Sequence, residues 1–241
     1  ECDTLHAPPG LRSEASLRAA RHHLLRESAA RCGCNRIALG HTMDDQAETI
    51  LMRMMRGAGR RGLSGMLPLG PGALVRPLLS IRRAALRDWL TTIAQPFRED
   101  ESNADPRYLR NQIRSQVVPV LESIAPGSVA SLARAGLILC EEDRFLDKIA
   151  SEWLDSQSPP DTKTIGISCA ALAGLPQVLA RRAARLLLVR AGDDPRGRSL
   201  AAGEAVLTLA RSGRDGACRN LAHGLSLKRE SGRLIAVPGR S

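Results

Sequence analysis

The chain has 241 residues, 43% of them hydrophobic, which is enough for one large domain or two small ones with a sizeable core. A formal charge of +10 favours a polyanionic partner, nucleic acid first, although a biased genomic composition would also enrich arginine. Aromatic residues make up only 2% of the chain, which argues against recognition by aromatic stacking platforms.

Cysteine usage and hydropathy indicate the compartment. The six cysteines are scattered, and Cys32-Gly33-Cys34 is their one close pair, with no Cys-x-x-Cys. No apolar run approaches the length of a membrane span. We therefore expect a cytoplasmic protein with no membrane partner, whose cysteines are buried as small hydrophobic residues.

Helical and extended patterns alternate along the first half, which is typical of an α/β sheet. The predicted elements are a helix over 11–31, a strand over 36–40, a helix over 42–56, a strand over 73–79 and a helix over 81–94. Ser80 is expected to cap the last of these helices, with Trp89 facing inward. Residues 57–62 match G-x-G-x-x-G, but a helix precedes them, so we interpret them as a glycine loop that ends a helix.

The second half is predicted to be mostly helical before a small mixed unit. Its predicted elements are a helix from Pro106, a long helix over 128–155, a linker over 156–160, helices over 176–190 and 199–210, a strand over 217–221 and a hairpin over 225–237. Four arginines suggest a basic binding surface on this unit: Arg181, Arg182, Arg185 and Arg190.

Carboxylates follow the first predicted strand. If a helix begins near His41, then His41, Asp45 and Glu48 lie within about 60° of one another on one helical face. Such a face beside a strand end could hold Mg²⁺ on a triphosphate, with Asp45 as a possible ligand. Acids in the first turn of a helix also serve as plain caps, so spacing alone leaves both interpretations open.

A basic stripe lies on the helix that begins at Pro106. Arg107, Arg110, Asn111 and Arg114 are spaced i, i+3, i+4 and i+7, without an interleaved acid. Apolar residues supply a separate side of the same helix, so a merely solvated stripe is the weaker interpretation.

Six motifs occur in the order that is found in tRNA(Ile)-lysidine synthases. They are His41-Thr-Met-Asp44-Asp45-Gln-Ala-Glu48-Thr49, Arg53 to Gly59, Gly62 to Met66, Arg76-Pro77-Leu78-Leu79, Glu99 to Asn103, and Arg110-Asn111-Gln-Ile-Arg114. Over most of residues 14–120 the chain therefore resembles this family of N-type ATP-pyrophosphatases. The resemblance implies an α/β fold with a partial doubly wound parallel sheet (1–122), a helical connector (123–157) and a small α+β tRNA-binding domain (158–241).

The resemblance also implies an activity, that of a carbon–nitrogen ligase. In this family ATP adenylates the wobble cytidine, position 34, of tRNA(Ile) with a CAU anticodon, and free lysine then displaces AMP from C2 to form lysidine, with Mg²⁺ as cofactor. Asp45, Glu48 and His41 would be catalytic. The nucleotide or tRNA contacts would be Arg18, Arg21, Arg56, Arg76, Arg110, Asn111 and Arg114. A dimer is possible.

One family feature is missing from the sequence. The Ser-Gly-Gly-x-Asp-Ser loop that binds ATP does not occur, and the chain starts with Glu1. We therefore expect an N-terminally truncated sequence that is inactive alone. Two alternatives are a 2-thiocytidine sulfurtransferase type of enzyme, whose C-x-x-C cysteine pair is absent, and a non-catalytic tRNA-binding fragment.

Overall fold

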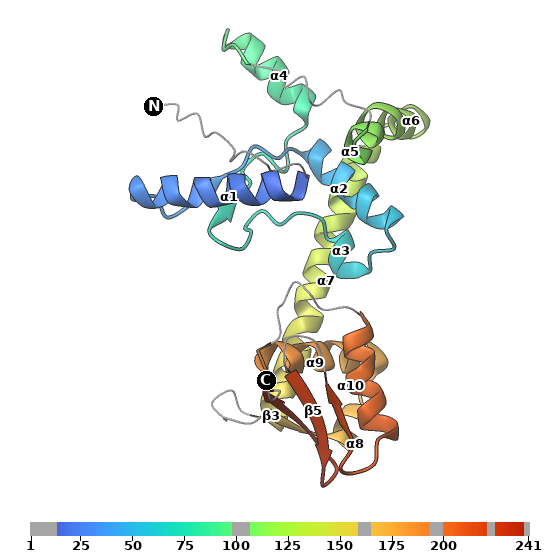
Figure 1. The fold of residues 1–241 in the computed structure, drawn as a ribbon. Coiled ribbons are helices and arrows are strands. Elements are labelled where there is room, and N and C mark those ends of the chain that lie inside the picture. The colour runs from blue at the N-terminus through green and yellow to red at the C-terminus, as the bar shows by residue number, and fades with distance from the viewer. Residues whose placement is uncertain (1–13, 98–106, 159–164, 193–199, 221–224, 239–241) are drawn as a thin grey trace. The chain divides into compact units, whose positions relative to one another are not determined.

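The computed structural model describes residues 14–97, 107–158, 165–192, 200–220 and 225–238 (Figure 1). The chain divides into two compact units, residues 1–140 and 141–241, and the division falls inside helix α7 (Ser128–Gln157). The predicted division into three parts stays a prediction. The 99–103 motif, Pro106 and the Pro-Pro end of the linker lie outside the described residues.

The first unit contains a parallel strand pair. Its elements are α1 (Glu14–Arg31), β1 (Ile37–Ala38), α2 (Met43–Met55), α3 (Arg60–Leu63), β2 (Leu74–Val75), α4 (Arg83–Thr92), α5 (Leu109–Gln112), the π-helical η2 (Ile113–Val117), α6 (Val118–Ile124) and the first part of α7. Ile37 pairs with Leu74, and Ala38 with Val75. The predicted α/β class with a parallel sheet is confirmed, whereas the doubly wound arrangement stays a prediction.

Both ends of α2 are fixed by local hydrogen bonds. Thr42 is the N-cap and forms a capping box with Asp45, so the helix begins at Met43, close to the predicted start at 42 and after the start near His41 that the shared face would need. At the other end Gly57 has a φ of 71°, and the Ala58 amide donates to the Arg53 carbonyl at 2.9 Å. This left-handed ending confirms the predicted glycine loop that ends a helix.

One face of α2 packs on the following loop and on α7. The buried Gln46 accepts a hydrogen bond from the Met66 amide at 2.7 Å and donates to the Met66 carbonyl at 3.1 Å. A Cβ on Gly136 of α7 would lie 2.8 Å from the Ile50 side chain, so the two helices are in close contact. The helical pattern of 42–56 predicts Met54 and Met55 to be buried with Ile50, but both are exposed in the last turn of α2.

Helix α4 begins two residues later than predicted. It starts at Arg83, its N-cap residue Arg82 supplies no side-chain cap, and Ser80 lies before it. None of its residues is buried, and Trp89, predicted to face inward, is 56% exposed. The amphipathic pattern of a helix shows which face is apolar, but not whether another element covers that face.

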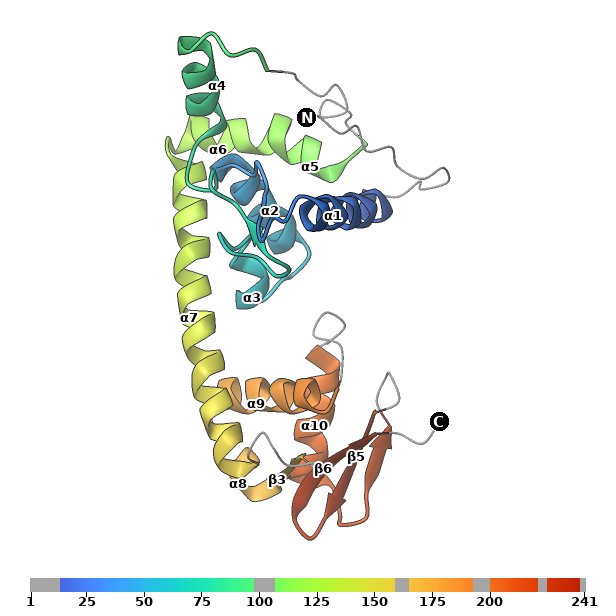
Figure 2. The same cartoon turned by 90° about the vertical axis from the view of Figure 1, so that its left-hand side faces the viewer.

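The second unit combines helices with a four-stranded antiparallel sheet of order β3-β6-β5-β4. Its elements are the rest of α7, β3 (Ile165–Ser168), α8 (Cys169–Ala173), α9 (Gln177–Arg190), α10 (Leu200–Ser212), β4 (Cys218–Asn220), β5 (Leu225–Glu230) and β6 (Arg233–Pro238). Helix α10 packs on the sheet and against α8 and α9 (Figure 2). The predicted hairpin is confirmed as β5–β6. Strand β3 and helix α8 were not predicted, because each is too short to show a clear hydrophobic period.

The predicted basic surface on α9 is wrong, because each of its four arginines is paired with a carboxylate. The pairs are Arg181 with Glu204, Arg182 with Asp143 and Asp147, Arg185 with Asp147, and Arg190 with Asp155. Burial lowers the pKa of Arg182, but the hydrogen bonds that it donates to Asp143 and Asp147 outweigh it and raise that pKa overall. The pairs of Arg182, Arg185 and Arg190 join α9 to the second part of α7, and the pair of Arg181 joins it to α10.

Cysteine burial is only partly as predicted. Cys140 and Cys169 are buried, and burial raises the pKa of the Cys169 thiol, whereas Cys32, Cys34 and Cys218 are exposed. Among the described residues no single helix is long and apolar enough to cross a membrane. Helices 109–124 and 128–157 reach that length and apolarity only as a pair, bent by 98°.

Replacement of Arg182 by alanine should strongly destabilise the second unit. Asp143 would remain buried without its cation, so we expect a loss of about 3 kcal/mol in the free energy of unfolding, measured by urea denaturation. Arg144→Ala is the matched control on α7, because Arg144 is exposed, and it should change stability by less than about 0.5 kcal/mol. Equal effects of the two changes would contradict the assigned role of the ion pairs.

Candidate active site

Two carboxylates on one face of α2 form the centre of the candidate site. Asp45 and Glu48 are three residues apart, which places them about 60° apart around the helix. The Glu48 side chain is only 1% exposed and that of Asp45 13%. Buried carboxylates need compensating charge, so their partners define the site.

Three arginines from two other segments surround this pair. Arg110 of α5 and Arg114 of η2 each donate to Glu48 at 2.8 Å and reach Asp45 Oδ1 at 3.0 and 3.3 Å. Arg83, at the start of α4, contacts Asp45 Oδ1 at 3.0 Å and Glu48 Oε1 at 3.2 Å. We call these five side chains the arginine–carboxylate cluster. Two negative and three positive charges give it a net charge of +1.

The cap of α2 orients and charges Asp45. The backbone amide and the hydroxyl of Thr42 each donate to Asp45 Oδ2 at 2.8 Å. Burial raises the pKa of Asp45, but the hydrogen bonds from Thr42 and the charges of Arg83 and Arg110 outweigh it, so this pKa lies below its usual value. The hydrogen bond to Glu48 raises the pKa of Arg114 against the effect of its burial. Asp45 and Arg114 are therefore both charged at neutral pH.

A second set of ion pairs and hydrogen bonds links α2, beside this cluster, to the start of α7. Arg82 contacts Asp44 of α2 at 3.2 Å and Glu122 of α6 at 3.1 Å. Glu122 accepts hydrogen bonds from the backbone amides of Val129 and Gly127, which chiefly lower its pKa, with a smaller contribution from Arg82. The first turn of α7 thus obtains its cap from the helix before it.

His41 is not on the face predicted for it. It precedes the N-cap of α2, and its Nδ1 accepts a hydrogen bond from Arg76 Nε at 3.3 Å. Arg76 also donates to the Leu67 carbonyl at 2.7 Å and is only 9% exposed, so its guanidinium helps to fix the backbone at Leu67. The i, i+4, i+7 relation failed because the helical twist starts only after Thr42.

The remaining predicted contact residues are not among the five side chains of the arginine–carboxylate cluster. Arg21 is exposed on α1, Arg56 is exposed at the end of α2, and Asn111 is buried on α5. The side chain of Arg18 lies outside the described residues. Their predicted roles in nucleotide or tRNA binding stay predictions.

Sequence reasoning missed Asp44, Arg82 and Arg83 as parts of the site. A signal for the two arginines was present, because cations in the first turn of a helix oppose its dipole. Two arginines at such a position therefore indicate a nearby negative charge. Which carboxylate supplies it is a tertiary fact, since Asp44 lies 38 residues before Arg82.

The cluster does not suit the predicted magnesium ligand Asp45. All four carboxylate oxygens of Asp45 and Glu48 already accept hydrogen bonds from Thr42 or an arginine. Within the part of the chain that the structure describes, no three His, Cys, Asp or Glu side chains gather into a metal-binding group. A Mg²⁺ ion would have to displace guanidinium groups, so we derive no chemical step through it.

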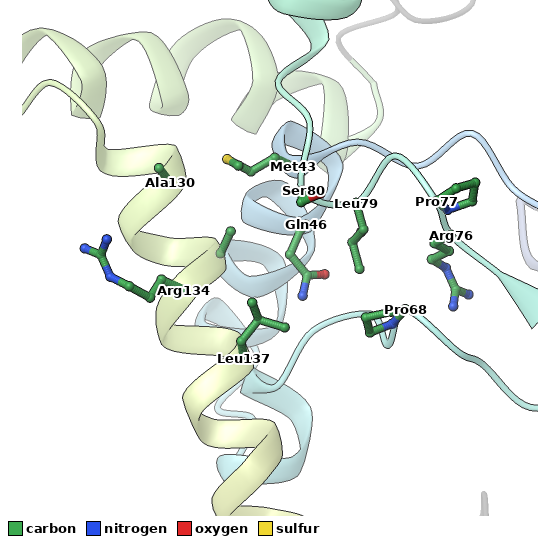
Figure 3. Close-up of a pocket in the computed structure, with 11 residues that line it drawn as sticks. Met43, Gln46, Pro68, Arg76, Pro77, Leu79, Ser80, Ala130, Arg134 and Leu137 are labelled. Carbon is green, nitrogen blue, oxygen red and sulfur yellow. The ribbon is translucent and has the colours of Figure 1, made fainter.

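A pocket of about 510 Å³ lies on the other face of α2 (Figure 3). Met43 and Gln46 belong to this face, opposite Asp45 and Glu48 around the helix. The other lining residues are Pro68, Arg76, Pro77, Leu79, Ser80, Ala130, Ala133, Arg134 and Leu137. Figure 3 shows Met43, Leu79 and Leu137 pointing into the pocket, whereas the guanidinium of Arg134 points away. Helix α2 thus separates a charged site from a mainly apolar one.

Comparison with known proteins gives the class and then the family. The PP-loop domain family matches residues 4–121, which cover the strand pair and the arginine–carboxylate cluster. The tRNA(Ile)-lysidine synthases of Salinispora arenicola and Salinispora tropica are each 36% identical to the chain, over 93% and 94% of it and 68% of each relative. The chain belongs to the tRNA(Ile)-lysidine synthase family.

The extent of similarity differs between relatives. The Geobacter sulfurreducens tRNA(Ile)-lysidine synthase is 44% identical over 57% of the chain, but this match spans only 29% of that relative. Among solved structures, the U34-tRNA thiolase NcsA from Methanococcus maripaludis resembles 54% of the chain with a TM-score of 0.44 and 19% identity, too remote for a functional argument.

The stability contributed by Asp45 should depend on pH. Because its pKa is lowered on folding, this contribution is present above the unfolded value, near 3.8, and is lost as the pH falls through the folded value. At pH 7 we expect Asp45→Asn to reduce the free energy of unfolding by about 2 kcal/mol, and by progressively less below pH 4. Urea denaturation across this range is the measurement. Asp88→Asn, at an exposed site on α4, is the control, and a pH-independent difference for Asp45→Asn would contradict the assignment.

Proposed function

We propose that the protein ligates free lysine to C2 of the wobble cytidine, position 34, of tRNA(Ile) with a CAU anticodon, through an ATP-adenylated tRNA. Family membership supports this activity. The observation that carries it is the buried, ionised Asp45 beside Glu48, held in reach of Arg110 and Arg114. ATP, lysine and this tRNA as partners, a cytoplasmic location and a possible dimer belong to the same proposal.

The two half-reactions make different demands on charge. In the first, the cytidine O2 attacks the α-phosphorus of ATP, a new P–O bond forms, and pyrophosphate leaves. Negative charge accumulates on the phosphates, and the arginines of the cluster can offset it. In the second, the ε-amine of lysine forms a bond to C2, the C2–O bond breaks, AMP leaves, and the amine releases its proton to water.

The Asp45 carboxylate could act as a general base or as the group that binds an ammonium, and its lowered pKa favours the second role. A carboxylate whose pKa is lowered is a weak general base, but it remains charged and can hold an ammonium group. We therefore assign Asp45, with Glu48, to binding and orienting the ε-ammonium of lysine before it loses its proton, which requires the ammonium to take the place of an arginine on these carboxylates. Arg110 and Arg114 are assigned to the phosphate side of the same site, because they already lie beside both carboxylates.

The two alternative functions have less support. A sulfurtransferase of the 2-thiocytidine type would need a C-x-x-C pair, whereas the sequence contains only Cys32-Gly33-Cys34 as a close pair, and the matching relatives are lysidine synthases. A non-catalytic tRNA-binding fragment would bind tRNA but leave lysine unincorporated. An assay that measures both quantities separates this alternative from the ligase.

Removal of either carboxylate should abolish lysine transfer. We expect Asp45→Asn and Glu48→Gln in the full-length protein to lower incorporation of labelled lysine by about 100-fold or more, with tRNA affinity within about twofold of wild type. Asp88→Asn, exposed on α4, is the matched control and should leave incorporation unchanged. Near-wild-type turnover in Asp45→Asn would refute the assigned role, and tRNA binding without any incorporation by the wild type would favour the fragment.

Binding of tRNA should weaken with salt, because phosphate contacts release counterions. We expect affinity to fall roughly 100-fold between 50 and 200 mM salt in a filter-binding titration. Arg56→Ala should reduce the salt slope by about one unit if the exposed Arg56 contacts a phosphate. Arg181→Ala, where the guanidinium is paired with Glu204, should leave the slope unchanged. A flat salt response would contradict a surface that contacts the tRNA backbone.

A further inference from the structure

Asp44 lies beside the carboxylate pair but is hydrogen-bonded to α4. Its Oδ2 accepts the backbone amide of Arg83, the first residue of α4, at 2.7 Å, and its Oδ1 accepts Arg82 Nε at 3.2 Å. Since the N-cap residue Arg82 offers no side-chain cap of its own, a carboxylate from α2 fills that position. A negative charge at a helix N-terminus also stabilises the helix through its dipole.

Helix α4 has little else that is buried to hold it. None of its ten residues is buried, and Trp89 and Ile93 are 56% and 49% exposed. The described ion pairs from its first turn to α2 and α6 all start from Arg82 and Arg83. The place of the Arg83 guanidinium therefore depends on how firmly Asp44 holds the start of the helix.

We infer that Asp44 is a positioning residue which, by capping α4 from α2, seats Arg83 over Asp45 and Glu48 and so sets the charge of the site. This inference rests on the proposed function. With Arg83 in place the cluster carries a net charge of +1, which suits a phosphate. With Arg83 withdrawn, two carboxylates face two arginines and the net charge falls to zero, which suits an ammonium better than a net positive charge, although Asp45 Oδ1 and Glu48 Oε1 still accept from Arg110 or Arg114.

Arg83 is the member of the cluster that can move alone. Arg110 and Arg114 lie on α5 and η2, which follow each other without a break, so neither can leave without disturbing the other. Arg83 lies on a separate helix, and its single Nη2 bridges both carboxylates. The adenylation step favours the seated arginine and the lysine step favours its withdrawal, so Asp44 would balance the two half-reactions.

The first test follows α4 directly and needs no turnover. The chain has two tryptophans, so Trp153→Phe leaves Trp89 on α4 as the sole reporter. In this background we expect Asp44→Ala to increase the local motion seen in time-resolved fluorescence anisotropy, and Asp44→Asn, which keeps one acceptor, to increase it less. Asp88→Ala, an exposed position on the same helix, should match the parent. An unchanged anisotropy decay in Asp44→Ala would overturn the inference.

The second test asks whether Asp44 acts through Arg83. Arg83→Met keeps the backbone amide that Asp44 accepts but removes the ion pairs to Asp45 and Glu48, so local motion should increase less than in Asp44→Ala while the site loses a cation. We expect Arg83→Met and Asp44→Ala each to slow tRNA-dependent ATP–pyrophosphate exchange about tenfold in the full-length protein, with no further loss in the double variant and no rise in the KM for lysine.

The outcomes separate the inference from the proposed function. Additive losses in the double variant, or a raised KM for lysine in Asp44→Ala, would overturn the positioning role. A wild-type protein that incorporates no lysine would contradict the proposed function alone, because the anisotropy experiment would still decide whether Asp44 holds α4.

Discussion

The first unit depends on the burial of two carboxylates among three guanidinium groups. Glu48 is almost completely buried, and such a charge is tolerated only when partners neutralise it and satisfy its hydrogen bonds. Those partners come from α4, α5 and η2, so a single requirement of charge compensation fixes segments that are 35 to 69 residues away from α2 along the chain. The same ion pairs therefore supply the charged groups of the candidate site and hold the segments of the first unit together.

The fold was predictable where patterns are local. The two strand segments of the first unit, the ending of α2 at Gly57, the long helix and the C-terminal hairpin all follow from residues close together in sequence. The parallel pairing of Ile37 with Leu74 is a long-range contact, and only the family resemblance implied it. The exposure of α4 could not be predicted, because an amphipathic pattern does not specify whether another element packs on the apolar face. The α9 arginines were misinterpreted for a related reason, since the carboxylate partners of Arg182 and Arg185 on α7 lie more than 30 residues earlier and that of Arg181 lies on α10.

The candidate site was half predictable. Spacing reveals that Asp45 and Glu48 share one helical face and that Arg110 and Arg114 share another, because the members of each pair lie about one turn apart. The contact between the two faces is tertiary, and spacing does not reveal it. His41 was misplaced because one residue, the Thr42 cap, separates it from helical geometry. Arg83 was missed because its partners are defined only by tertiary structure, although its place in the first turn of a helix was already unfavourable.

Every cation in the cluster is an arginine, and this residue type affects which amine can attack an activated base in the site. A guanidinium keeps its proton far above neutral pH and is not a nucleophile there, whereas a lysine side chain deprotonates more readily. If the site binds an amine beside an electrophilic base, a lysine of the protein in the same position would compete for the bond. Three arginines can hold the carboxylates in readiness without themselves becoming joined to the RNA.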